Sequence, residues 1–180
     1  MSEPDHTPLS VLTGYPTSNY HDAMRLLGLR GSFTTGLAPL GTAPVRFAGR
    51  ATTARFLPSR GRRPTRLTMY DLIERAGAGG VPLLCRGVLM NASAQLELRA
   101  PGEALDCAGA LVLPGDIVVA DGDGAVFVSP ADLAEVLGAV RHVASVVEAV
   151  MPLVRAGATA KTVAEALAAK RALPVSQDKS

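Results

Sequence analysis

Apolar residues recur at helical spacing through the last third of the chain. These positions, three or four residues apart, are Leu133, Val136, Leu137, Val140, Val143, Val147, Val150 and Val154. The spacing places them on one face and predicts one long amphipathic helix. Ser129 is a suitable cap for its start, and Pro130 suits the first helical position. Pro152 is expected to kink the helix near its end, because proline lacks the backbone N–H that the helix uses.

Three further segments carry helical signals. Residues 17–27 form the first of them, with Thr17 or Ser18 as the cap and Gly28 as the stop. The other two are residues 67–80 and 162–173. Each is an apolar-periodic run of moderate length, so we expect helices that pack on a core by one face.

Between these helices, short apolar runs bounded by glycine, proline and aspartate predict strands. The expected strands lie at residues 45–56, 81–90, 94–100, 104–113, 116–120 and 125–129. The first of these is either one strand or a bent pair. The order of helix, strands and long helix predicts an α/β or α+β domain with a strand-rich middle. In this layout residues 1–16 form a flexible tail, 17–157 form the domain, and 158–180 form a C-terminal helix and tail.

The composition is typical of a globular protein. Of 180 residues, 48% are hydrophobic and 19% are charged, which provides enough apolar surface for a core. A net charge of +2 does not favour nucleic acid as a partner, and no apolar run approaches the roughly 18 residues of a membrane span. The two cysteines make no disulfide framework, and the polar N-terminus does not resemble a signal peptide. We therefore predict a cytoplasmic protein without a membrane partner.

The most acidic stretch is "DGDG", residues 121–124, between two apolar runs. Paired aspartates could hold a metal ion. A calcium loop, however, also needs an oxygen ligand at its fifth position and glutamate at its twelfth, where this chain has Ala125 and Asp132. A hairpin turn is the better explanation, because Asp-Gly readily adopts the backbone of a tight turn. We interpret Asp121 and Asp123 as a structural turn, which leaves any metal ligands unknown.

Seven arginines form the other concentration of charge. They are Arg46, Arg50, Arg55, Arg60, Arg62, Arg63 and Arg66. Arginine binds carboxylate and phosphate through paired hydrogen bonds, so this group could hold an anionic substrate. A solvated loop or the rim of an oligomer interface is the alternative. The candidates for substrate binding are Arg50, Arg55 and Arg66.

The segment "ALDCAGALVLPGDIVVADGDGAVFVSPADLAEVLGAV" resembles the RraA-like family, which includes 4-hydroxy-4-methyl-2-oxoglutarate aldolases and the regulator of ribonuclease E activity. Members carry a similar strand, a hairpin of the form PGD-apolar-AD-x-DG-apolar-P, and a long helix. The matching positions are Pro114, Gly115, Asp116, Asp121, Asp123, Gly124 and Pro130. "NYHDAMRLLGLRG", "VRFAGRATTARF" and "VPLLCRG" are similar to the family's first helix, first strands and a later strand. The resemblance thus covers most of residues 17–157.

This resemblance implies a swivelling β/β/α fold and a homotrimer or a hexamer of two trimers. In the family's aldolases the active sites lie between subunits, and Mg²⁺ near bound pyruvate polarises the 2-oxo acid. A DG-x-x-R-D motif supplies the Arg for the carboxylate and the Asp for the metal. That motif is absent here, since no Arg is followed by Asp or Glu. The family's glycine-rich loop, helix and motif strand, a unit of roughly 30 residues, is also missing on one side or the other of "VPLLCRG".

Three functions are compatible with these observations. The first is an enzyme with altered chemistry on an anionic or carbonyl-bearing small molecule, in a specialised biosynthetic pathway, with Arg86, Asp22 and His21 as catalytic candidates. The second is a non-catalytic oligomeric protein that binds or regulates a protein partner. The third is a metal-dependent 2-oxo-acid aldolase or decarboxylase, which the missing motif disfavours. Mg²⁺ would be the cofactor if the family chemistry survives, and no other cofactor is indicated.

Overall fold

The computed structural model describes residues 8–29, 33–39, 45–58, 84–86, 96–99 and 101–168. Its helices are α1 (Leu9–Leu12), α2 (Thr17–Leu26), α4 (Leu133–Arg155) and α5 (Ala160–Ala168). Its strands are β1 (Ala38–Pro39), β2 (Phe47–Arg50), β3 (Arg55–Pro58), β4 (Leu84–Cys85), β5 (Leu96–Arg99), β6 (Leu105–Cys107), β7 (Ala110–Val112), β8 (Ile117–Asp121) and β9 (Gly124–Val128). The predicted α+β class is confirmed. The predicted helix at 67–80 lies outside the described residues.

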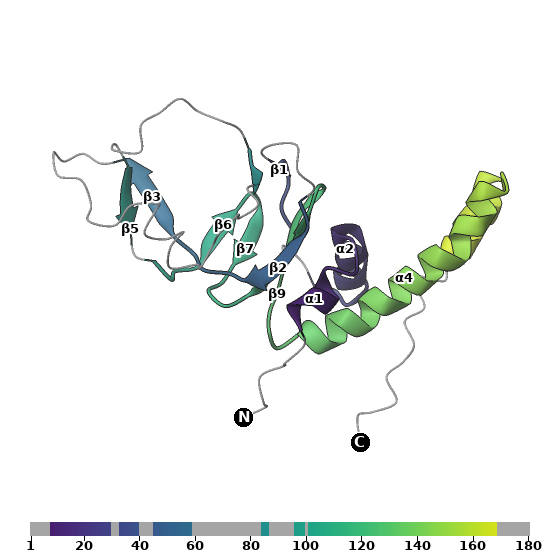
Figure 1. Cartoon of the computed structure of the whole chain (residues 1–180), viewed down its shortest axis with the longest axis horizontal. Helices are drawn as coiled ribbons and strands as arrows, with labels where there is room; N and C mark the ends of the chain where they lie inside the picture. Colours follow the sequence, from purple (N-terminus) through teal and green to yellow (C-terminus); the bar gives the residue numbers. More distant parts are fainter. Residues whose placement is uncertain are drawn as a thin grey trace, which may run out of the picture.

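The central sheet has three antiparallel strands in the order β2-β8-β9. Ile117 pairs with Arg50 on one side and with Val128 on the other. Around this sheet lie three two-stranded pairs, β1-β4, β3-β5 and β6-β7. In Figure 1 the helices lie on one side of the central sheet and the small strand pairs lie on the other.

Both faces of β8 and β9 are buried. One face carries Ile117, Val119, Val126 and Val128 into a core with α2 and α4. The other face carries Ala120, Ala125 and Phe127 into a smaller core beneath β7. Side chains alternate between the faces of a strand, so two buried faces require apolar residues at nearly every position. That requirement explains the unbroken apolar runs on both sides of "DGDG".

The predicted long helix is confirmed as α4. Val136, Val140 and Val143 are fully buried in the core, as the three- and four-residue spacing requires. The helix begins at Leu133, later than a Ser129 cap implies, because residues 129–132 form a turn in which the Asp132 N–H donates to the Ser129 carbonyl at 3.0 Å. By length and hydropathy α4 could cross a membrane, and its N-terminal half, from Leu133 to Val143, packs into the core with α2 and the central sheet.

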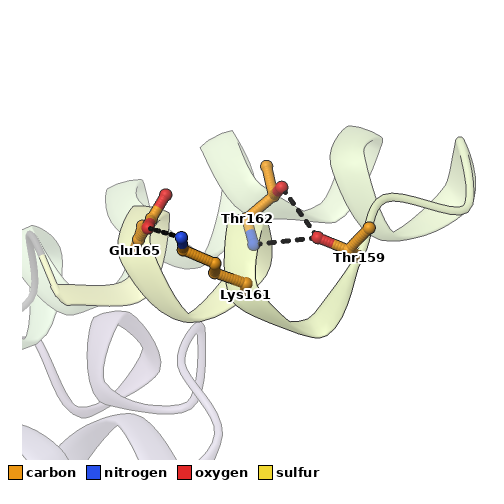
Figure 2. A network of polar contacts seen from close by, with 4 residues as sticks. All are labelled: Thr159, Lys161, Thr162 and Glu165. Atoms are coloured by element: carbon orange, nitrogen blue, oxygen red, sulfur yellow. Dashed lines mark hydrogen bonds and ion pairs between the residues drawn. The ribbon is translucent and has the colours of Figure 1, made fainter.

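The C-terminal part of α4 extends beyond the sheets and carries α5 at its far end (Figure 1). The start of α5 is held by Thr159, whose Oγ1 accepts the Thr162 N–H at 3.3 Å and lies 3.0 Å from the Thr162 hydroxyl oxygen (Figure 2). On the exposed face of the helix, Nζ of Lys161 and Oε1 of Glu165 lie 4.0 Å apart and form an ion pair (Figure 2). The predicted final helix is confirmed as far as Ala168, where the described residues end.

The structure decides between the two alternatives for one expected strand and differs from the prediction for another. The segment 45–56 is the bent pair, with β2 and β3 separated by residues 51–54. The segment 104–113, expected as one strand, is a hairpin of β6 and β7. The chain reverses because Ala108 and Gly109 both adopt positive φ angles, and the Asp106 carboxylate accepts the Gly109 N–H at 3.2 Å. An Asp side chain that bonds a nearby N–H stabilises a tight turn, and this outweighs the strand pattern.

Candidate functional site

The carboxylate of Asp121 joins the β8–β9 hairpin to the start of α2. One oxygen accepts the backbone N–H of Thr17 at 2.8 Å, and the other accepts the Thr17 hydroxyl at 2.6 Å. The Asp123 N–H donates to the same carboxylate at 3.0 Å. Burial raises the pKa of the Asp121 carboxyl. The hydrogen bonds from Thr17 and Asp123, together with the charge of Arg46, outweigh it and leave the pKa below its ordinary value.

Asp121 serves as the N-terminal cap of α2 from a distant part of the chain. The residue at the capping position is Pro16, which makes no side-chain hydrogen bond to the helix. The predicted cap by Thr17 or Ser18 is therefore wrong, because the Thr17 hydroxyl points to Asp121. A carboxylate at this end of a helix meets its unpaired N–H groups and the positive end of its dipole. The predicted stop is confirmed, since Gly28 follows α2 with a φ of +75°.

A second contact holds the segment before β1 against β9. The Thr34 N–H donates to the Ala125 carbonyl at 2.9 Å, and the Ala125 N–H donates to the Thr34 hydroxyl oxygen at 3.0 Å. Beside them Gly124 has a φ of +141°, and a Cβ there would lie 3.1 Å from the Thr34 hydroxyl oxygen. The approach of Thr34 to the hairpin therefore depends on glycine at position 124.

A pocket of about 250 Å³ lies between these two contacts. Its walls are the first turn of α2, the segment at Phe33, and the tip and first residues of β9. The side chains with chemical function are Thr17, Ser18, His21, Phe33, Thr34 and Asp123. The rings of His21 and Phe33 meet edge to face, with centroids 4.2 Å apart and an interplanar angle of 72°. This contact fixes the imidazole at the wall of the pocket.

The polar groups of the pocket fall into two sets. The hydroxyls of Thr17 and Thr34 are held by Asp121 and by the backbone of Ala125. Within the described part of the chain, the side chains of the other three, Ser18, His21 and Asp123, make no hydrogen bond to protein. The pocket therefore offers a ligand one hydroxyl, one imidazole and one carboxylate.

Of the three predicted catalytic residues, His21, Asp22 and Arg86, the pocket wall contains one. His21 lines it, whereas Asp22, the next residue of α2, does not. Arg86 follows β4, and its guanidinium donates to the carbonyl of Thr35, the residue after Thr34, at 3.4 Å. Arg86 also lies near Cys107. Burial and the negative charge of Asp106 raise the pKa of the Cys107 thiol, and the positive charge of Arg86 offsets part of that increase. Only His21 of the three belongs to the pocket wall.

The predicted anion-binding arginines lie away from the pocket. Arg50 ends β2 and is exposed. Arg55 is exposed on β3 and donates to the Ala104 carbonyl at 3.5 Å. Neither lines the pocket. Arg66 lies outside the described residues. The substrate roles of the three remain predictions.

The hairpin interpretation of "DGDG" is confirmed, because Asp121 pairs with Gly124 across a two-residue turn. A divalent ion such as Mg²⁺ needs several free oxygen ligands. The carboxylate of Asp121 is already occupied by N–H and O–H donors, and among the described residues no group of three acidic, His or Cys side chains gathers in one place. The hairpin does not fit a metal ion, so we derive no chemical step through one.

Sequence patterns do not reveal the pocket's other members. Ser18 and Thr34 carry no motif and appear as ordinary polar residues of a helix start and a loop. Phe33 lies in a loop pattern and carries no signal of its own. The one signal in the sequence is Asp121 itself, an aspartate at the end of an expected strand.

No protein-family model matches the chain, and no curated protein matches it in sequence. Solved structures do share its fold. An uncharacterized protein from Pseudomonas syringae pv. tomato is 23% identical with a TM-score of 0.66, over 88% of this chain and 100% of that one. Streptomyces coelicolor RraAS2, described as an unusual member of the RNase ES inhibitor RraA protein family, is 23% identical with a TM-score of 0.61, over 78% and 94%.

A third structure, described as belonging to novel cellulases from microbes associated with the gut ecosystem, is 16% identical with a TM-score of 0.63, over 81% of this chain and 89% of that one. Identities at this level establish the fold and not the activity. The chain therefore has an RraA-like fold, as the "PGD…DG" hairpin and the long helix predict.

Proposed function

We propose that this RraA-like protein is an enzyme that binds a small carbonyl-bearing molecule between α2 and the β8–β9 hairpin. His21 moves a proton on the carbon next to the carbonyl. The proposal is carried by one observation: the imidazole of His21, which makes no hydrogen bond to the described part of the chain, lines a pocket of about 250 Å³ in edge-to-face contact with Phe33. This volume is below the roughly 300–1,000 Å³ of sites for drug-sized ligands, and it suits a small metabolite.

The chemistry assigned to the pocket needs only its own residues. A nitrogen of the His21 imidazole takes the proton from the carbon beside the carbonyl. The electron pair of that C–H bond becomes the C=C bond of an enolate, and the carbonyl electrons move to its oxygen. The Ser18 hydroxyl, which makes no hydrogen bond to the residues that the structure describes, donates a hydrogen bond to this oxygen. Return of the proton from His21 to carbon completes the cycle.

Proton exchange in D₂O tests the proposal. The protein is incubated with hydroxyacetone, dihydroxyacetone, pyruvate and oxaloacetate, and loss of the proton signals next to the carbonyl is followed by NMR. We expect catalysed deuterium incorporation for at least one compound and its loss in His21→Gln. His142→Gln, on α4 and outside the pocket, is the matched control and should keep the wild-type rate. Exchange equal in wild type and His21→Gln would refute the proposal.

A second candidate function is favoured by the end of α4. Met151, Leu153 and Val154 are 40%, 36% and 48% exposed on the part of the helix that extends beyond the sheets (Figure 1). Exposed apolar side chains on a projecting helix are typical of protein-binding surfaces. This observation supports the predicted oligomer, a homotrimer or hexamer, or a regulatory protein partner. Sedimentation of the wild type and of Leu153→Glu tests whether this surface forms an oligomer. We expect an oligomeric wild type and a smaller species for Leu153→Glu, and a monomeric wild type would refute the predicted oligomer.

A further inference from the structure

We infer that the pocket selects uncharged hydroxy-carbonyl compounds, the small hydroxy-ketones and hydroxy-aldehydes, and rejects carboxylates such as the 2-oxo acids. The inference rests on the proposed function and names its substrate class. It departs from the anionic ligand that the arginines in the sequence indicate.

The anion position at the start of α2 is already filled from within the protein. A free helix N-terminus attracts carboxylates and phosphates through its unpaired N–H groups and its dipole. Here the Asp121 carboxylate accepts the Thr17 N–H at 2.8 Å, and the Asn19 N–H donates to the Pro16 carbonyl at 3.0 Å. Asp121 is only 8% exposed, so a ligand does not displace it. The N-terminus of α2, which could otherwise bind an anionic ligand, is therefore already occupied by the Asp121 carboxylate.

Among the described residues of the pocket wall, the remaining charge is negative. Asp123 lines the wall, with Asp121 behind Thr17. Among the described residues that line the pocket none is Lys or Arg. Arg46 is exposed, does not line the pocket, and its charge acts on Asp121. A ligand carboxylate would meet Asp123 with no Lys or Arg among the described lining residues to offset its charge, and repulsion between two unit charges a few ångströms apart weakens binding by about tenfold or more.

The groups left for a ligand complement a hydroxyl beside a carbonyl. The Asp123 carboxylate accepts a hydrogen bond from a ligand hydroxyl. Ser18 can donate to a ligand carbonyl while His21 lies at the same wall. Phe33, which is 40% exposed, presents apolar ring surface to the C–H bonds of the ligand. Each group has one partner in a hydroxy-ketone, whereas a 2-oxo acid leaves Asp123 facing a second carboxylate.

Hydroxyacetone and pyruvate test this inference, because they differ only in a CH₂OH group against a carboxylate. Each is titrated into the protein, and binding is followed by the ring-proton signals of His21. We expect saturable binding of hydroxyacetone and an affinity for pyruvate at least about tenfold lower. Asp123→Asn, which removes the charge and keeps the size, should bring the two affinities together. Glu135→Gln, an exposed acid on α4 outside the pocket, should leave the difference unchanged.

If Asp123→Asn does not fold, the wild type alone still tests whether the pocket repels carboxylates. Salt screens repulsion between charges, so pyruvate should bind more tightly as ionic strength rises while hydroxyacetone should not respond. Pyruvate binding equal to or tighter than hydroxyacetone, or weakened by salt, overturns the inference and leaves the proposed function standing. Absence of binding and of catalysed exchange for both compounds overturns the two proposals together.

Discussion

Asp121 and Thr17 are 104 residues apart in the chain and are joined by two hydrogen bonds, to the backbone N–H at 2.8 Å and to the hydroxyl at 2.6 Å. The pair fixes the first turn of α2 against the end of β8. Ser18 and His21 belong to that turn and the next, so the geometry of the pocket depends on this one carboxylate.

Removal of the Thr17 hydroxyl should destabilise the protein. Thr17→Val keeps the shape of the side chain and the backbone N–H contact but removes the hydroxyl, one of the two donors to Oδ1 of buried Asp121, which keeps only the Asp123 N–H. A hydrogen bond to a charged group is worth about 1.5–3 kcal/mol, so we expect a loss of that size in the free energy of unfolding, measured by urea denaturation. Thr17→Ser retains the hydroxyl and should lose much less. Equal losses in the two variants would show that the hydroxyl contributes little.

Stability should fall in acid through Asp121. The pKa of this carboxyl lies below its ordinary value of 3.8, so the ionised form stabilises the folded state at neutral pH. That contribution is complete above about pH 5 and is lost as the pH falls below about 4 and through the folded-state pKa. Urea denaturation of wild type and Asp121→Asn from neutral to acid pH measures it. The stability gap between the two should be constant near neutrality and should shrink below about pH 4; a gap independent of pH would contradict the assignment.

Alanine at position 124 should be costly, and alanine at position 122 should not. Gly124 has a φ of +141°, and a Cβ there would lie 3.1 Å from the Thr34 hydroxyl oxygen. Backbone strain of this kind costs about 1–3 kcal/mol, and Gly124→Ala should therefore lower the midpoint of thermal unfolding. Gly122, two residues earlier in the same turn, has no positive φ and no atom within 4 Å of its added Cβ. Gly122→Ala is the matched control, and a midpoint shift as large as that of Gly124→Ala would refute the steric explanation.

The two halves of α4 should respond differently to the same substitution. Val140 is 0% exposed in the core, whereas Val154 is 48% exposed near the end of the helix. A fully buried valine side chain contributes about 1.5–3 kcal/mol by burial, so Val140→Ala should lower the free energy of unfolding by an amount in that range. Val154→Ala should change it by no more than about 0.5 kcal/mol in the monomer. A large loss at Val154 that depends on protein concentration would instead reveal a partner copy on this surface.

Local pattern predicts α4 and the β8–β9 hairpin correctly, because the information for both lies within neighbouring residues. The apolar spacing from Leu133 to Val150 matches the buried face of α4, and the two apolar runs around "DGDG" become the paired strands. Where two local signals compete, as at Ala108 and Gly109, turn chemistry outweighs strand pattern and the predicted strand becomes a hairpin.

The pocket is not predictable in this way, since its members come from three separate parts of the chain. His21 is a lone histidine on a helix, Thr34 is one of several loop threonines, and Asp123 belongs to an ordinary turn. They meet only because Asp121 caps α2 and because β9 accepts Thr34 beside Gly124. Both contacts span more than 90 residues, beyond the reach of any periodicity.

The sheet that is buried on both faces also determines its own register by side-chain volume. Since neither face of β8 and β9 meets water, polarity does not distinguish the two sides. The β-branched residues, such as Ile117 and Val126, fill the core beneath α2 and α4, whereas Phe127 and the alanines Ala120 and Ala125 fill the smaller core beneath β7. A slip of one residue would move Phe127 and the alanines into the core beneath α2 and α4 and the β-branched residues into the core beneath β7, overpacking some positions and creating cavities at others. The hairpin is thus held in place by the sizes of its side chains, and substitutions that exchange a valine with an alanine across the two faces should be tolerated far less than their unchanged hydrophobicity suggests.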